Sequence, residues 1–128
     1  MVVNPYHHRM LFTSYSFLLT ALIAAYHDLD YLFWVDIFLF LTSVNYWRYP
    51  LKDWRRNIDI LMVIITIFCH YLAINDYTDV VLIFVIVGLY STCKISSDKN
   101  LSSICHSLMH IITACLFIKS YETLEVSQ

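Results

Sequence analysis

The stretch IDILMVIITIFCHYLAI, residues 58–74, decides the fold class of this chain. It is apolar over most of its length, with a carboxylate near one end, Asp59, and an imidazole near the other, His70. At a rise of 1.5 Å per residue, a helix of about 17–25 residues crosses the roughly 30 Å hydrocarbon core of a bilayer. The stretch has no continuous polar face, which a helix of a water-soluble bundle would need. It therefore predicts a membrane-spanning helix.

Four more apolar stretches lie along the chain. They cover residues 10–26, 31–47, 80–93 and 101–118. Hydrophobic residues make up 59% of the 128 residues and charged residues 14%, whereas about 25% are charged in a typical soluble domain. The four cysteines form no CxxC pair, so we expect small buried thiols and no disulfide framework. The sequence predicts an all-α integral membrane bundle of five transmembrane helices, forming one membrane domain over residues 1–128.

The charged residues predict an orientation for this bundle. If the five helices alternate in direction, most basic residues fall on the side of the N-terminus, namely Arg9, Arg48, Lys52, Arg55, Arg56, Lys94 and Lys99. The opposite side holds Lys119 with Asp28, Asp30, Asp76, Asp79, Glu122 and Glu125. The positive-inside rule then puts the N-terminus inside, in the cytosol or the mitochondrial matrix, and the polar tail 120–128 outside. The endoplasmic reticulum, the Golgi and the mitochondrial inner membrane all fit. A net charge of −2 gives no reason to expect nucleic acid as a partner.

Polar side chains within the spans recur on single helix faces. In the second and third spans they are spaced by seven and four residues, and in the fifth by four, which aligns them on one stripe of each helix. Because polar groups are costly in lipid, we expect these stripes to face the bundle interior. By depth they form two groups. The group near the basic side consists of Ser43, Asp59, His106 and His110, and the group near the other side consists of Asp36 and His70.

The two histidines of the first group lie in the segment CHSLMH, residues 105–110. Their i, i+4 spacing is the usual way in which one helix offers two ligands to a metal ion. Asp59 can act as a third ligand or orient a metal-bound water. A metal ion at this position would act as a Lewis acid and lower the pKa of bound water.

A structural role is the alternative for the same residues. The histidines would then bond to backbone carbonyl groups or to nearby serines, namely Ser43, Ser102 and Ser103. Asp59 would cap the third helix or pair with Arg55 or Arg56.

This pattern resembles the superfamily that unites the alkaline ceramidases with the adiponectin and progestin receptors. In that family a Ser-x-x-x-His motif closes the second of seven helices, an Asp opens the third and an HxxxH motif opens the last. This chain has Ser43, Asp59 and the pair His106 and His110 in that order, with Trp47 at the position of the first zinc histidine. The resemblance implies a zinc site near the cytosolic face and hydrolysis of a lipid amide. Zinc-bound water would attack the carbonyl group, Ser43 would stabilise the oxyanion and Asp59 would handle the proton.

The second group supports a different function. Asp36 is the one acidic residue well inside a span, where a bare carboxylate costs about 2.5–3.5 kcal/mol. A hydrogen bond with His70 would lower that cost, and an Asp–His pair in a membrane can relay protons because histidine titrates near neutral pH. The pair predicts a proton or ion conduit, with a structural buried hydrogen bond as the alternative.

A third class of function needs no site. Five short helices form a thin bundle, which favours a homo-oligomer or a role as a non-catalytic accessory subunit of a larger membrane complex. The basic loop RYPLKDWRR, residues 48–56, would contact the anionic head groups of membrane lipids. The sequence thus leaves three functions open: a zinc-dependent lipid amide hydrolase, an accessory subunit and a conduit.

Overall fold

The computed structural model describes residues 5–73 and 77–126, with the backbone alone for residues 77–79 and 82. Five α-helices account for most of this region: α1 His7–Tyr26, α2 Asp30–Trp47, α3 Trp54–Ala73, α4 Tyr77–Ile95 and α5 Lys99–Val126. The prediction of an all-α chain with five helices is confirmed, whereas the crossing of a membrane by all five helices stays a prediction. Asp76 and the side chain of Asp79, which entered the expected orientation, lie outside the described residues.

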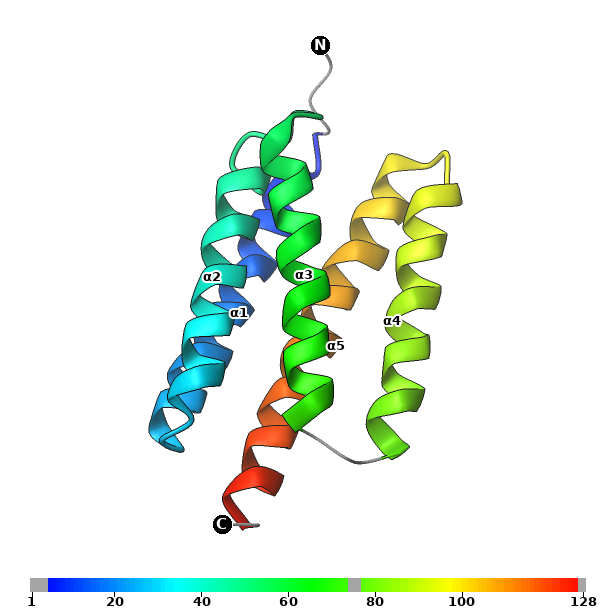
Figure 1. Cartoon of the computed structure of the whole chain (residues 1–128). Helices are drawn as coiled ribbons and strands as arrows, with labels where there is room; N and C mark the ends of the chain where they lie inside the picture. Colours follow the sequence, from blue (N-terminus) through cyan, green and yellow to red (C-terminus); the bar gives the residue numbers. More distant parts are fainter. Residues whose placement is uncertain (1–4, 74–76, 127–128) are drawn as a thin grey trace.

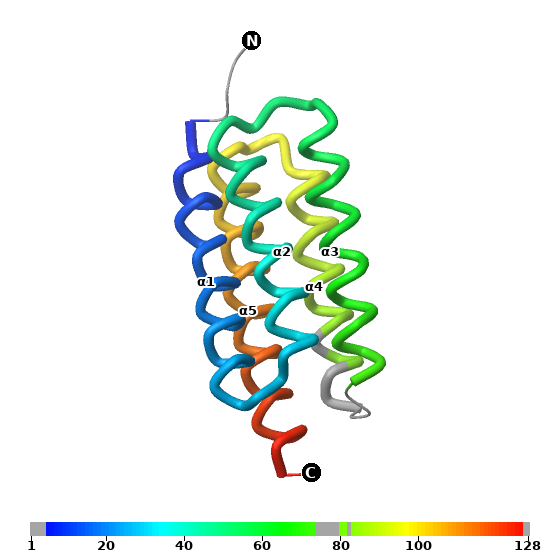
Figure 2. The backbone as a smooth tube through the Cα atoms, turned by 60° about the vertical axis from the view of Figure 1, so that its left-hand side comes forward, coloured from blue at the N-terminus to red at the C-terminus, as the bar shows by residue number. Residues whose placement is uncertain are grey.

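The helices run alternately up and down, so that α1, α3 and α5 point in one direction (Figure 1). Helix α1 packs on both α2 and α5, α2 also packs on α3, and α4 packs on α5. The α1 and α5 pair is parallel and stays in contact over its whole length, from Arg9 with Asn100 near the start to His27 with Glu125 near the end. The tube in Figure 2 shows α1 and α5 side by side. The α3 and α4 helices, although consecutive in the chain, do not pack extensively on each other in the described part of the chain.

The main core lies where α1, α2 and α5 meet. It is built from Phe17 and Ala24 of α1, Leu32 and Leu39 of α2, and Phe117 with Tyr121 of α5. Ala24 is fully buried, and a small side chain at this position lets neighbouring helix backbones approach closely, as small residues do in membrane bundles. A smaller apolar cluster joins α4 to α5 through Ile86, Met109 and Leu116.

Carboxylates cap two of the helices that begin at the basic end of the bundle, where the N-terminus lies, namely α5 and α3. Asp98 Oδ1 accepts a hydrogen bond from the Asn100 backbone N–H at 2.8 Å, which satisfies a free donor in the first turn of α5. Asp53 does the same for α3 by accepting from the Arg55 backbone N–H at 3.0 Å, and the Arg55 guanidinium also donates to it. These side-chain hydrogen bonds from Arg55 hold the pKa of Asp53 below its ordinary value. Asp53, and not Asp59, is therefore the cap of the third helix and the partner of Arg55.

The left-handed residue that follows the end of α1 is an aspartate and not a glycine. Asp28 has φ = 55°, and the Leu29 and Asp28 backbone N–H groups donate to the Ala24 and Ala25 carbonyl oxygens at 2.9 and 3.1 Å. This pair of bonds is the Schellman arrangement, in which a left-handed residue lets the last carbonyl groups of a helix find donors. It turns the chain directly into α2.

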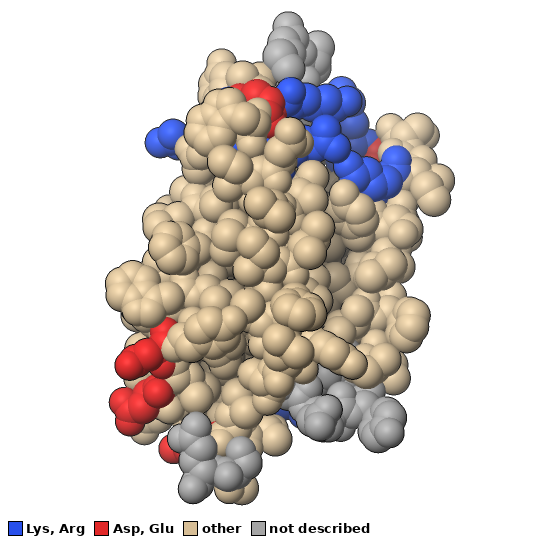
Figure 3. Space-filling view, viewed as in Figure 1, with Lys and Arg blue, Asp and Glu red and all other residues tan. Residues whose placement is uncertain are grey.

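Within the described residues, three helices are long and apolar enough to cross a membrane, α1, α3 and α5, and a shorter apolar stretch covers Ile83–Ile95 of α4. Large apolar side chains are exposed on the outside of the bundle, for example Phe12, Trp34, Phe68 and Phe84. Lysine and arginine gather at the end where the N-terminus lies, with some acidic residues among them, and a separate group of acidic residues lies toward the other end (Figure 3). Both features are typical of a membrane protein.

Helix α5 is longer than the sequence pattern predicts. The apolar stretch ends at residue 118, but the helix continues to Val126. Its last turns are amphipathic, because Ser120 and Tyr121 are buried whereas Glu122 and Glu125 are exposed. The expected polar tail is thus largely helical, and Glu125 forms an ion pair with His27 at 2.6 Å.

Candidate functional site

A cavity of about 260 Å³ lies between α3, α4 and α5. Its walls are mostly apolar, with Ile64 and Ile67 from α3, Ile86 and Val87 from α4, and Met109 from α5. Phe17 of α1 and Leu39 of α2 also line it. The cavity exists because α3 packs on α2 and α4 packs on α5, which leaves the α3 and α4 helices apart.

Three groups that the sequence singled out line this cavity together: Asp59, His106 and His110. Asp59 comes from the start of α3 and the histidines from the first half of α5, so all three belong to the basic half of the bundle. Asp59 and His110 are buried, and His106 is half-buried. An apolar pocket with a few convergent polar groups is the arrangement expected of a ligand site.

Ser43 holds Asp59 in place. The Ser43 hydroxyl donates to Asp59 Oδ1 at 2.7 Å, and Ser43 is almost fully buried. Ser43 is not among the described residues that line the cavity. The Ser43 hydroxyl proton lies in the hydrogen bond to the carboxylate, so Ser43 positions Asp59 in this structure.

The histidine rings are held by aromatic and hydroxyl contacts. Their centroids lie 4.8 Å apart with the ring planes at 76°. His110 Nδ1 is 3.0 Å from the Thr13 hydroxyl of α1, and its ring packs against Phe17 at 5.1 Å. Neither histidine bonds to Ser43, Ser102 or Ser103 in the described hydrogen-bond network, in which Ser102 and Ser103 donate to backbone carbonyl groups instead.

Trp47 occupies the place next to His106. The two ring centroids are 4.8 Å apart at an interplanar angle of 71°. The indole is buried, and its Nε1 has no hydrogen-bond partner among the described residues. A large apolar ring therefore stands where the family resemblance would have a metal-binding imidazole.

These donors do not fit a catalytic zinc ion, which takes three protein ligands at about 2.0–2.2 Å. Within residues 5–73 and 77–126, no three histidine, cysteine, aspartate or glutamate side chains gather closely enough to hold a metal. His106 and His110 offer two donors, while Asp59 is bonded to Ser43. The chemistry of the cavity is therefore that of a carboxylate and two imidazoles.

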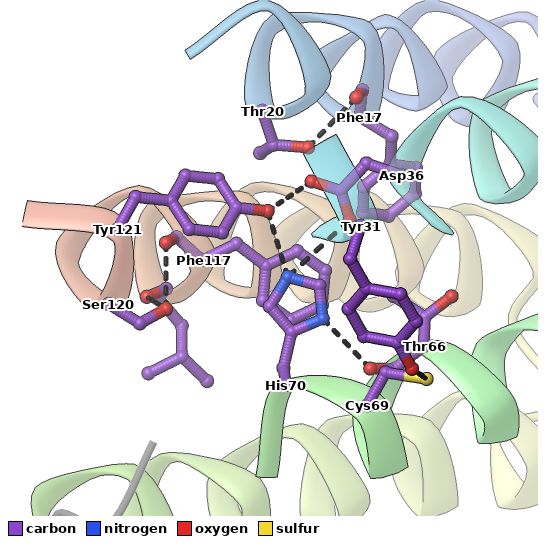
Figure 4. A network of polar contacts seen from close by, with 11 residues as sticks. Phe17, Thr20, Tyr31, Asp36, Thr66, Cys69, His70, Phe117, Ser120 and Tyr121 are labelled. Atoms are coloured by element: carbon purple, nitrogen blue, oxygen red, sulfur yellow. Dashed lines mark hydrogen bonds and ion pairs between the residues drawn. The ribbon is translucent and has the colours of Figure 1, made fainter. Parts of the chain in front are cut away.

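A second polar site lies deeper in the bundle, toward the acidic end. Asp36 and His70, which the sequence pattern pairs by depth, are brought together with Asp36 Oδ1 3.5 Å from His70 Nε2. The Tyr121 hydroxyl lies between them, 2.8 Å from His70 Nε2 and in a short hydrogen bond with Asp36 Oδ2 (Figure 4). His70 Nδ1 donates to the Thr66 carbonyl oxygen at 2.8 Å. Phe117 stacks on the imidazole with ring centroids 3.6 Å apart.

Sequence reasoning missed Tyr121 because it lies beyond the apolar stretch. A signal was present nonetheless: His110, Phe117 and Tyr121 repeat the seven-and-four spacing that marks the polar stripes of the second and third helices. Thr13, the partner of His110, could not be identified from spacing, because spacing within one helix does not say which neighbour the helix packs against.

The resemblance to the ceramidase and receptor superfamily depends on Ser43, Asp59, His106 and His110. The structure brings three of them to one cavity and bonds the fourth to Asp59. No family model, curated protein or solved structure matches this chain.

Proposed function

We propose that this chain is a multi-pass membrane protein that binds a lipid in the cavity between α3, α4 and α5. The acyl chain would occupy the apolar part of the cavity, and the polar group of the lipid would meet Asp59, His106 and His110. The observation that carries the proposal is the presence of these three groups on the wall of one apolar cavity of about 260 Å³.

The position of the cavity favours a lipid over a water-soluble ligand. Ile64 and Val87 line the cavity, yet they are 60% and 54% exposed on the outside of the bundle. The cavity therefore opens sideways between α3 and α4, on a surface that also exposes Phe68 and Phe84. In a membrane this surface faces acyl chains. The volume exceeds the roughly 150 Å³ of an engineered cavity that binds benzene, so a segment of one acyl chain fits.

The polar groups favour a lipid with both hydrogen-bond donors and acceptors. Asp59 offers a carboxylate acceptor, and a neutral imidazole has one donor and one acceptor nitrogen. Because the Thr13 hydroxyl engages His110 Nδ1, His110 offers only its Nε2 to a ligand. An amide with neighbouring hydroxyl groups, as in a ceramide, presents the complementary set. This match and the family resemblance point to the same class of lipid.

Hydrolysis of the lipid amide is the second candidate function, and Asp59 is the residue that favours it. Its carboxylate lines the cavity, and Ser43 orients it. It would accept a proton from a water molecule that attacks the amide carbonyl, as a general base does, and return that proton to the nitrogen as the C–N bond breaks, which releases the amine and the carboxylic acid. No metal takes part in this step, because the donors present fall short of a zinc site.

A photoactivatable ceramide with a diazirine in its acyl chain tests lipid binding. The protein is reconstituted in lipid bilayers and illuminated, and the adducts are mapped by mass spectrometry. Ile86 and Met109 are the diagnostic positions, because they line the cavity but are buried from the outside. We expect adducts there and their loss in Ile64→Trp, which fills the opening.

Ile65→Trp is the matched control, because Ile65 is the neighbouring residue, is exposed and does not line the cavity. It should leave the adducts unchanged. Adducts confined to outward-facing residues, equal in both variants, would reject the proposal and favour an accessory subunit. Turnover of a ceramide-like amide is measured in parallel on Asp59→Asn, which keeps an acceptor for Ser43. Turnover in the wild type that is lost in this variant would establish hydrolysis, and binding without turnover would reject it.

A further inference from the structure

We propose that Asp36, Tyr121 and His70 form a proton-binding site that holds one shared proton within the bundle. The proposal follows from counting protons in three hydrogen bonds, and it does not depend on the ligand of the cavity. Asp36 and Tyr121 are fully buried and His70 is 3% exposed. The three residues come from α2, α5 and α3 and meet at one point (Figure 4).

Each of the three contacts needs its own proton. The Thr66 carbonyl oxygen has none to give, so the 2.8 Å contact with His70 Nδ1 requires a proton on Nδ1. The contact between His70 Nε2 and the Tyr121 hydroxyl, also 2.8 Å, requires a second. The contact between Tyr121 and Asp36 Oδ2 requires a third.

The neutral side chains supply one proton too few. A neutral imidazole brings one and the phenol brings one, while an ionised Asp36 brings none. Without a further proton, two acceptors would face each other at hydrogen-bond distance in a buried site, which is costly. The Thr20 hydroxyl of α1 donates to the Phe17 carbonyl oxygen at 2.8 Å and also lies within reach of Asp36 and Tyr121. It does not provide the missing proton, because it takes part in none of the three contacts.

One proton taken from water completes the network in either of two arrangements. On His70 Nε2 it makes an imidazolium that donates to Tyr121, which in turn donates to Asp36. On Asp36 it makes a carboxylic acid that donates to Tyr121, which donates to His70. In both arrangements the three residues together carry no net charge, which suits a site inside an apolar bundle.

Other titratable groups near this site are already paired or lie at the surface. Tyr31 of α2 donates to the Cys69 thiol of α3 at 2.7 Å. His27 of α1 pairs with Glu125 of α5. Lys119 and Glu122 of α5 are exposed, and the titratable side chains described on α4, Tyr90, Cys93 and Lys94, lie toward its opposite end.

The shared proton makes stability depend on pH in a defined direction. In the unfolded chain Asp36 loses its proton near pH 3.9 and His70 near pH 6.5. Between these two pH values the unfolded chain has an ionised Asp36 and a protonated His70. It therefore binds as many protons at these residues as the folded chain does, and the site adds no pH dependence to the free energy of unfolding. Above about pH 6.5 the folded protein holds one proton more, and the unfolding equilibrium constant should rise up to tenfold per pH unit.

Asp36→Asn tests this count, because the amide can donate to Tyr121 without an extra proton. Reversible unfolding is measured from pH 5 to 8 in mixed micelles of a mild detergent and sodium dodecyl sulfate. The ratio of the wild-type to the variant unfolding constant should increase about tenfold per pH unit over this range. Asp30→Asn, the same change at the exposed start of α2, should leave the ratio constant. A constant ratio for Asp36→Asn would overturn the proposal.

Nitrogen NMR of the histidine rings gives a second test that needs no folded Asp36 variant. The His70 signals are identified by their loss in His70→Gln. We expect His70 to keep a proton on Nδ1 and to show no titration between pH 5.5 and 8. A His70 ring that titrates like a free imidazole, with a midpoint near 6.5, would overturn the proposal.

Discussion

The indole of Trp47 packs edge-on against the imidazole of His106, with ring centroids 4.8 Å apart. Trp47 ends α2 and His106 lies near the start of α5, so this contact joins two helices at the basic end of the bundle. A side chain at position 47 thus reaches the pair formed by His106 and His110. Tryptophan cannot bind a metal there, but the backbone position suits a residue that can.

Trp47→His should therefore create a zinc site. The new imidazole would stand beside His106 and supply the third donor that a zinc ion requires. We expect the purified wild-type protein to carry well below one zinc per chain and the variant to carry about one. Metal content by mass spectrometry, on protein purified in detergent, measures the difference.

Two further variants separate this site from adventitious zinc. Trp54→His introduces a histidine at an exposed position at the start of α3 and should bind none. Adding His106→Ala to Trp47→His should abolish binding. If the wild type instead carries about one zinc that a His106→Ala/His110→Ala variant loses, a two-histidine site suffices and our conclusion on the donor set is wrong.

Helical periodicity was enough to find the faces of the buried polar residues. Asp36 and Ser43 on α2, and Asp59 and His70 on α3, are all buried, because their spacing of seven or eleven residues returns a side chain to the same face. Depth along the span was enough to pair Ser43 with Asp59 and Asp36 with His70, since helices of alternating direction bring corresponding depths together.

The cavity and Tyr121 could not be found in this way. The cavity depends on which helices pack together, and the pattern of a single helix does not contain that information. Tyr121 was obscured because it lies among the polar residues that follow the apolar stretch, Lys119, Ser120 and Glu122, although the helix continues. The ion pair between Glu125 and His27 and the burial of Tyr121 hold these last turns to the bundle.

Asp28→Gly should stabilise the turn between α1 and α2. Asp28 has φ = 55°, a conformation that costs a residue with a Cβ atom more than it costs glycine. The Schellman bonds from Asp28 and Leu29 to the end of α1 use backbone atoms alone and survive the change. We expect a gain of about 0.5–1 kcal/mol in the free energy of unfolding. Asp28→Asn removes the charge but keeps the Cβ atom, so an equal gain there would assign the effect to charge.

Arg55→Gln should raise the pKa of Asp53. The Arg55 side chain lowers this pKa through its hydrogen bonds at 2.7 and 2.9 Å. Because the folded pKa is depressed, the stabilisation is present above the unfolded value of about 3.9 and is lost as the pH falls through the folded value. In the variant the folded pKa lies closer to the unfolded value, so the stabilisation should be smaller and its loss should be complete at a higher pH. Carboxyl-carbon NMR of Asp53 measures the change in pKa. Arg56→Gln leaves the two side-chain hydrogen bonds from Arg55 to Asp53 intact and should change this pKa little.

Tyr121→Phe should destabilise the protein through the loss of one hydroxyl group. The change keeps the ring that packs in the core with Phe17 and Leu39, but it removes the group that lies between Asp36 and His70. Both would be left buried without this hydrogen-bond partner, at a cost of about 1–3 kcal/mol in the free energy of unfolding. Tyr71→Phe removes the same atom from an exposed side chain on α3 and should cost less than about 0.5 kcal/mol. Equal effects of the two variants, measured by unfolding in mixed micelles, would mean that the Tyr121 hydroxyl contributes no more than a surface group.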